Sequence, residues 1–389
     1  MANYSSTPAL NNLTSFLASS FNETSTPMTP FLEELLDHLG FEMWESVINT
    51  FILPVINLIG IAFCSFSLWI FSRETFEDPI FFYYKLLSFI NIIHLLHNIP
   101  KCFLFSPLYF PEINSYVVSI YQIYYAVMSN FLFHFEDVLQ MGILLHKMKI
   151  FSSFVKKHYS ASPKMISLAF FITCFVIDFS GFILFKVTSL GNYFYFDEKG
   201  IKQTNTFFYY TPSDFSQSLL GKILVGFTIY FLNLFISVLV GVTINIVSYV
   251  KYKSHMTMRQ REIEQLQISS IHNRPTTNRE IEQLKHRERI EHQIERNMFY
   301  MSLTLCSISI LSRFLIMVNA AYFLFSSSFR KSLISTTLNT TIYTLVPTMS
   351  IFVFYSFNKM FRDETKKKLF GKEPRPYPRI IFISNEVHF

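Results

Sequence analysis

Four charged side chains inside otherwise apolar stretches are the residues of this sequence best suited to chemistry. Glu136, Asp137, Asp178 and Arg313 each interrupt a run of mostly hydrophobic residues. Charges are costly in hydrocarbon and normally face the interior of a helix bundle or a water-filled cavity, so each of the four is a candidate for function.

Arg313 is the most costly of the four to place in hydrocarbon, because arginine keeps its proton, and therefore its charge, in proteins. It needs an acidic partner, a water-filled cavity or an anionic ligand group, and Asp137 and Asp178 are the available partners. A pair with Asp137 would link two helices and form the floor of a ligand cavity. An internal ion pair of purely structural value is the alternative, and the sequence does not choose between Asp137 and Asp178.

The composition indicates a chain embedded in lipid. Of its 389 residues, 50% are hydrophobic, 18% aromatic and only 15% charged, against about 25% charged in an average soluble domain. The mean hydropathy of +0.30 agrees. Disordered and collagen-like chains are excluded, and a soluble multi-domain enzyme is disfavoured. Four cysteines cannot form a disulfide framework in a chain of this length.

No motif for catalysis or cofactor binding is present. The sequence has no phosphate-binding loop, no Gly-x-Ser-x-Gly and no His or Cys cluster with metal-ligand spacing. We therefore expect no enzyme activity, no cofactor and no nucleic-acid partner, and we expect the lipid bilayer as the surrounding solvent.

Seven apolar runs are long enough to cross a bilayer, which takes roughly 20 helical residues. The sequence therefore predicts an all-α bundle of seven transmembrane helices over residues 48–357. The third run is the least secure, because it contains Glu136 and Asp137. The approximate spans are 48–72, 80–104, 116–145, 165–187, 218–250, 298–325 and 333–357.

Basic residues predict the orientation, because cytoplasmic loops are enriched in Lys and Arg. With the N-terminus outside, the inner segments hold 24 of the 33 basic residues and the outer ones hold 7. The tail 1–47 contains glycosylation sequons at Asn3, Asn12 and Asn22, which are usable only in the lumen. We expect a multi-pass plasma-membrane protein with an outside N-terminus.

The inner segments 251–297 and 358–389 have their own patterns. The first is a long basic loop in which Arg261-Glu-Ile-Glu-Gln-Leu266 recurs as Arg279-Glu-Ile-Glu-Gln-Leu284. Spans five and six are expected to continue as helices, joined by a turn at Asn273-Arg-Pro-Thr-Thr-Asn278. They would offer a charged surface to a partner or form a self-associating coil.

In the second segment Asn358 is placed to cap a short interfacial helix. Its apolar residues would lie beside a row of lysines that can face lipid headgroups.

Three motifs support a resemblance to a known family. They are Gly60-Ile-Ala-Phe-Cys-Ser-Phe-Ser-Leu-Trp-Ile-Phe, Leu87-Ser-Phe-Ile-Asn91 and Phe354-Tyr-Ser-Phe-Asn-Lys-Met-Phe-Arg362. Over residues 48–370 the chain resembles divergent rhodopsin-like (class A) G-protein-coupled receptors, including invertebrate FMRFamide and other neuropeptide-receptor-like chains. The resemblance implies an extracellular ligand, a heterotrimeric G protein as partner and signalling through displacement of span six.

The resemblance also assigns the G-protein side. His146, Lys147 and Met148 stand where the family has Asp-Arg-Tyr, and Arg296 lies near the inner end of span six. Lys147 keeps a cation but lacks the planar guanidinium, and His146 cannot supply the acidic neighbour. Lys147 either contacts a G protein or acts as a snorkelling anchor.

A second family site, a sodium pocket, is altered in this chain. The matching positions are Asn91, Glu136, Cys64 and Ser350, so the carboxylate has moved from span two to span three. We expect Glu136 to be a cation ligand or a neutral acid bonded to Asn91, and burial favours the neutral acid. The family's outer disulfide is also missing, since Gln122 occupies the position of its span-three cysteine.

Two other functional classes remain open on the sequence. An ion channel of the insect odorant-receptor type has seven helices but an inside N-terminus, and a transporter or sensor without G-protein coupling would explain Lys147. The region before residue 48 has six acidic and no basic residues. That charge favours a cationic peptide as ligand.

Overall fold

The computed structural model describes residues 47–104, 115–159, 161–179, 181–196, 202–225, 237–273, 278–324 and 329–371. All of them belong to one compact unit, Ser46–Phe389. The sequons at Asn3, Asn12 and Asn22 lie outside the described residues.

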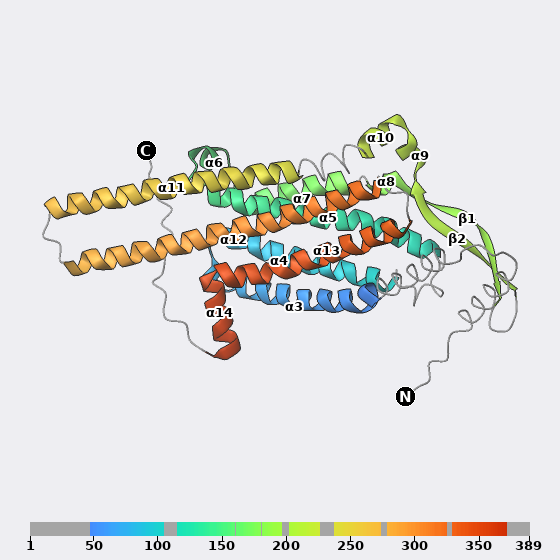
Figure 1. Ribbon diagram of the computed structural model, residues 1–389, viewed down its shortest axis with the longest axis horizontal. Helices are drawn as coiled ribbons and strands as arrows, with labels where there is room; N and C mark the ends of the chain where they lie inside the picture. The colour runs from blue at the N-terminus through green and yellow to red at the C-terminus, as the bar shows by residue number, and fades with distance from the viewer. Residues whose placement is uncertain are drawn as a thin grey trace, which may run out of the picture. The chain divides into compact units, whose positions relative to one another are not determined.

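Long helices make up most of this unit (Figure 1). A π-helical turn, Ile48–Ile52, leads into the first of them and a 3-10 turn, Glu74–Phe76, precedes the second. The long helices are α3 (Leu53–Phe71), α4 (Pro79–Leu104), α5 (Ser115–Met148), α7 (Pro163–Phe179), α11 (Ser237–Asn273), α12 (Asn278–Leu324) and α13 (Phe329–Phe357). Short helices are α6 (Ser153–His158), α8 (Gly181–Leu184), α9 (Asp214–Gln217), α10 (Leu219–Val225) and α14 (Lys359–Phe370).

The long helices pack as a bundle around α5. This helix contacts α4, α7, α11 and α12, while α3 packs on α4 and α13, and α12 packs on α13. Within the described residues, five helical stretches are long and apolar enough to cross a membrane, and α5 and α11 are not among them. The polar residues in the middle of α5 lower its hydropathy, and the described part of α11 begins only at Ser237.

A β-hairpin follows the fourth long helix, which the prediction of a purely helical fold omitted. The strands β1 (Phe185–Phe196) and β2 (Lys202–Pro212) pair antiparallel, with an irregularity between Ser189 and Gly191. Helix α8 ends at Leu184, so the fourth helical region stops short of the expected residue 187. Aromatic and β-branched residues, which favour strands, dominate the segment that follows.

Aromatic side chains close the bundle where α14 lies, here called the α14 end. Phe71 contacts Phe354 and Phe361 at ring-centroid distances of 4.9 and 5.1 Å. Helix α14 begins as expected, because the side chain of Asn358 accepts a hydrogen bond of 3.0 Å from the backbone N–H of Phe361. The helix is capped at its other end by Gly371 with φ of 65°. The predicted short helix after the last span is confirmed.

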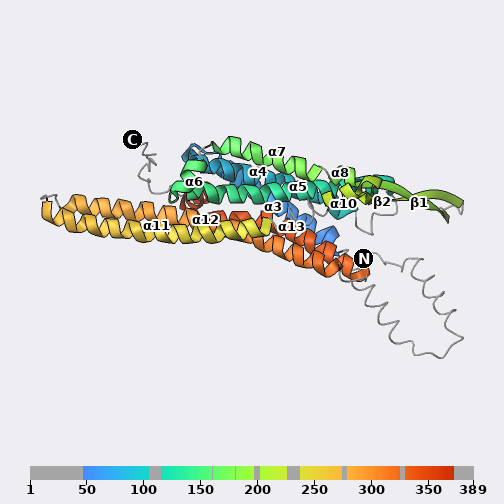
Figure 2. The ribbon, with the colours of Figure 1, turned by 90° about the horizontal axis from the view of Figure 1, so that it is seen from above.

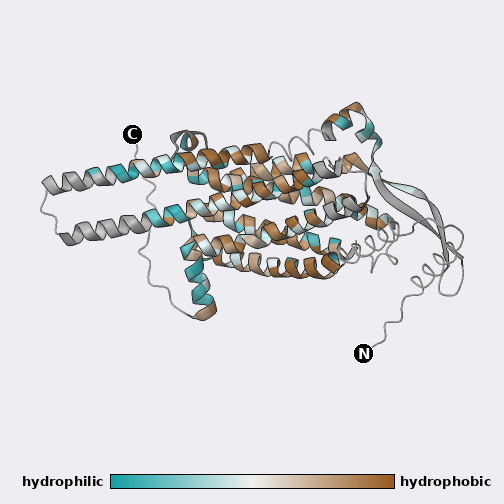
Figure 3. Cartoon of the chain, in the orientation of Figure 1, coloured by the Kyte–Doolittle hydropathy of each residue, from teal (hydrophilic) through white to brown (hydrophobic). Residues whose placement is uncertain are grey.

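Helices α11 and α12 run side by side and antiparallel over a long distance (Figures 1 and 2). Within the bundle, the residues of α11 and α12 are mostly hydrophobic. The described residues beyond the bundle are hydrophilic (Figure 3). The helices end and begin at Asn273 and Asn278, as the sequence predicts, and residues 274–277 are outside the described residues.

Candidate functional site

The centre of the bundle contains a buried ion pair between α5 and α12. The Asp137 carboxylate pairs with Nε of Arg313 and also accepts a hydrogen bond from the Ser309 hydroxyl. The guanidinium carbon of Arg313 lies 3.8 Å from the ring centroid of Phe133. Both charged residues are no more than 3% exposed. The pair therefore ties together two helices through charges that water does not screen.

Asp178 of α7, the other acidic candidate, pairs with a histidine instead. Nδ1 of His134 lies 2.9 and 2.8 Å from the two carboxylate oxygens of Asp178. Because His134 occupies the Asp178 carboxylate, Asp137 is the acidic partner of Arg313. Sequence reasoning did not assign His134 a role, although its position one turn before Asp137 on α5 was a usable signal.

Glu136 has different neighbours from those expected. Its Oε1 accepts a hydrogen bond of 3.2 Å from Gln140, and its Oε2 lies 3.7 Å from Nδ1 of His94 in α4. The predicted hydrogen bond to Asn91 is therefore wrong. Gln140 follows Glu136 by one helical turn and takes one carboxylate oxygen, while His94, one turn further along α4 than Asn91, faces the other.

Asn91 is fully buried, and within the described part of the chain its amide has no hydrogen-bond partner. The thiol of Cys64 donates to the backbone carbonyl of Pro347 at 3.7 Å, and the Ser350 hydroxyl donates to the same carbonyl at 2.7 Å. Among the described residues, no group of three or more His, Cys, Asp or Glu is placed to hold a metal ion. All four cysteines, Cys64, Cys102, Cys174 and Cys306, are buried and free.

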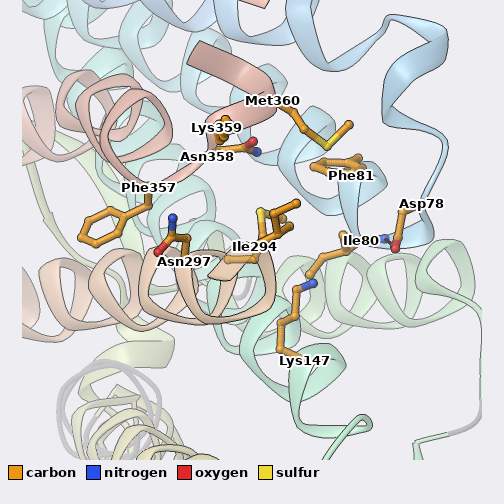
Figure 4. Close-up of a pocket in the computed structure, with 11 residues that line it drawn as sticks. Asp78, Ile80, Phe81, Lys147, Ile294, Asn297, Phe357, Asn358, Lys359 and Met360 are labelled. Carbon is orange, nitrogen blue, oxygen red and sulfur yellow. Dashed lines mark hydrogen bonds between the residues drawn. The ribbon is translucent and has the colours of Figure 1, made fainter. Parts of the chain in front are cut away.

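A pocket at the α14 end collects residues from five parts of the chain (Figure 4). Lys147 projects into it from the last turn of α5, and Asp78 and Ile80 approach from the start of α4. Lys147 is only 8% exposed. Burial lowers its pKa, against the opposing effect of Asp78 and Glu295. Lys147 therefore directs a largely buried side chain into this pocket. The pocket is lined by Asp78, Ile80, Phe81, Lys147, Ile294, Asn297, Met298, Phe357, Asn358, Lys359 and Met360.

The other residues expected on the G-protein side have separate surroundings. His146 packs its ring 5.8 Å from that of Tyr83, and the Met148 sulfur accepts a hydrogen bond of 2.8 Å from Ser248 of α11. Arg296 is exposed on α12 and does not line the pocket. Its neighbour Glu295 pairs with Arg259 of α11 at 2.7 Å, so α11 and α12 are also joined by an ion pair.

Comparison with known proteins identifies the fold. No protein-family model and no curated protein matches the sequence. The crystal structure of squid rhodopsin is similar to this structure with a TM-score of 0.55, over 85% of this chain and 81% of that chain. The sequences are 12% identical. The chain thus has a seven-helix membrane fold of the kind seen in squid rhodopsin.

Proposed function

We propose that the protein is a G-protein-coupled receptor of the plasma membrane, transducing an extracellular ligand to a cytoplasmic G protein. The observation that carries the proposal is the buried Asp137–Arg313 pair, which joins α5 to α12 inside a rhodopsin-like bundle. A fold alone hosts many functions, so the argument rests on this site.

The pair gives a ligand a way to act on α12. Arg313 holds α12 against α5 through Asp137. A ligand that draws either charge away weakens this tie and leaves α12 free to move as a rigid helix. Movement of α12 would carry Ile294 and Asn297 away from Lys147, opening the pocket at the α14 end to a partner.

The proposed ligand is a cationic peptide. A basic ligand group would compete with Arg313 for the Asp137 carboxylate, and the acidic, Lys- and Arg-free region before residue 48 would attract such a ligand. The resemblance to FMRFamide and other neuropeptide-receptor-like chains supports the same ligand class.

A sensor without G-protein coupling is the second candidate. It is favoured by the burial of Lys147, which stands where the family has an arginine and cannot offer a planar guanidinium to a partner.

Nucleotide exchange on a panel of G proteins, with a peptide library as stimulus, tests the proposal. We expect at least one peptide to stimulate exchange, and Arg313→Gln or Asp137→Asn to lose the response by more than tenfold at equal surface expression. The exchanged pair, Asp137→Arg with Arg313→Asp, should recover part of it. Lys222→Gln, which removes an exposed charge from α10, is the matched control and should respond normally.

Three outcomes contradict the proposal. Peptide binding without exchange on any G protein would favour the uncoupled sensor, and peptide-gated current would favour a channel. Normal signalling by Arg313→Gln would show that the ion pair has no part in transmission.

A further inference from the structure

Two cations from distant parts of the sequence lie against one tryptophan at the α14 end. The guanidinium carbon of Arg73, just after α3, is 4.3 Å from the ring centroid of Trp69. Nζ of Lys368, in the last turn of α14, is 5.3 Å from the same centroid. The chain therefore places two positive charges around one tryptophan ring.

Neither cation is neutralised within the described part of the chain. The ion pairs found there involve neither Arg73 nor Lys368. Nε of Arg73 is buried and has no hydrogen-bond partner. A buried N–H without an acceptor costs about 1–3 kcal/mol, so an acceptor at this position would be favourable.

The position of Lys368 is fixed by the docking of α14. Phe361 is fully buried against Phe71 and Phe354, and Asn358 caps the first turn. Because α14 is a continuous helix that also contacts α3, its last turn is held beside Trp69. The cluster is thus part of the packed structure.

The surroundings of the cluster match a lipid headgroup region. Trp69 is 42% exposed, and the residues that follow Lys368, Leu369 and Phe370, are 62% and 68% exposed. In Figure 3, α14 is hydrophilic along most of its length and hydrophobic at its far end. Exposed tryptophan and apolar residues next to lysines are typical of the boundary between headgroups and acyl chains.

We propose that Arg73, Trp69 and Lys368 form a binding site for the phosphate headgroup of an anionic phospholipid. The Arg73 guanidinium would donate Nη–H bonds to phosphate oxygens, for which its planar group is suited. Lys368 adds a second charge, and Leu369 and Phe370 lie where the acyl chains begin. The site is independent of the proposed receptor function, because it requires only the membrane fold.

Tryptophan fluorescence can test this site directly, because the chain has only two tryptophans. In a Trp44→Phe background, Trp69 is the single reporter. The protein is placed in phosphatidylcholine nanodiscs that contain the same small fraction of brominated phosphatidylserine or brominated phosphatidylcholine. We expect brominated phosphatidylserine to quench Trp69 at least twofold more strongly.

Two charge-matched double variants decide whether the site is specific. Arg73→Gln with Lys368→Gln should abolish the excess quenching, whereas Lys366→Gln with Lys367→Gln should retain it. The second pair removes two exposed charges from the same helix. Arg73→Lys with Lys368→Arg keeps both charges and should retain most of the excess quenching. It replaces the first double variant as the test if that variant folds poorly.

Several results would overturn the proposal. Equal loss in both Gln double variants would indicate diffuse attraction, and equal quenching by the two brominated lipids in the parent would indicate no headgroup selection. Relief of the excess quenching by millimolar inorganic phosphate would indicate a site for the free ion.

Discussion

At the scale of single residues, the interior of the bundle is arranged so that each buried carboxyl group has a different side chain as its main partner. Asp137 takes Arg313, Asp178 takes His134, and Glu136 takes Gln140. Charges buried in this way are weak evidence for stability, since apolar residues of the same size could replace them. In the proposed receptor, their value would lie in specifying which helices pair and in letting a charged ligand break the tie between α5 and α12.

Removing one member of the central pair should destabilise the protein. Arg313→Gln leaves Asp137 as a buried charge without its cation, which costs about 3–5 kcal/mol in buried pairs. We expect a clear fall in the thermal unfolding temperature of the purified protein in detergent. Arg296→Gln removes an exposed charge from the same helix and should change little. An Arg313→Gln protein as stable as the parent would contradict the buried pair.

His146 should make stability depend on pH. Burial lowers the pKa of His146 from 6.5 to about 4, helped by Lys149 and Lys147. The unfolded chain therefore binds this proton at higher pH than the folded one, and stability should fall as pH drops from 6.5 to about 4.

Thermal unfolding across this pH range checks the contribution of His146. His146→Gln should flatten the dependence, whereas His255→Gln, a half-buried control on α11, should leave it unchanged. If His146→Gln leaves the change of unfolding temperature with pH as it is in the parent, His146 is not its source.

The sequence was informative about which residues matter and less so about their partners. Rare charges in apolar runs marked Glu136, Asp137, Asp178 and Arg313, because hydrocarbon penalises them wherever the helices sit. The choice between Asp137 and Asp178 depends on how α5, α7 and α12 are rotated about their axes. No local pattern encodes that rotation, which is why the bond between Glu136 and Asn91 was predicted wrongly.

At the scale of elements, close packing of α3, α4 and α13 depends on a glycine. A Cβ added at Gly60 would meet Oγ1 of Thr348 and approach Cδ1 of Leu95 to 2.8 Å. Small residues at such contacts let helix backbones come close in a membrane protein.

Gly60→Ala should therefore lower the unfolding temperature, since overpacking typically costs about 1–3 kcal/mol. Thermal melts in detergent measure the change, and Ser65→Thr, which adds one methyl group at an exposed position of α3, is the control. If the two variants melt alike, the three helices do not pack closely at Gly60.

Elements with a strong local signal could be predicted, and those without one could not. The cap at Asn358 and the break around residues 273–278 have chemistry that acts within a few residues. The hairpin β1–β2 was missed because its strands pair residues that are far apart for a local pattern, up to Phe185 with Pro212 at the open end. Aromatic content alone did not distinguish such a hairpin from a packed loop.

At the scale of the whole molecule, the helix pattern is shared with squid rhodopsin at 12% sequence identity. Two sequences that share few residues therefore reach the same arrangement of helices. Lys147 and Glu136 stand at positions where the resemblance described above implies other residues.

The orientation in the membrane is the claim on which the receptor proposal depends most. The distribution of 24 and 7 basic residues between the two sides predicts that the chain begins outside and ends in the cytosol. Glycosylation at Asn3, Asn12 or Asn22 would agree with this orientation.

Epitope tags at the two termini, probed with antibodies on intact and permeabilised cells, test it most directly. The account predicts that the N-terminal tag is stained on intact cells and the C-terminal tag only after permeabilisation. Staining of both tags under the same condition would place the termini on one side, and would contradict a seven-helix receptor.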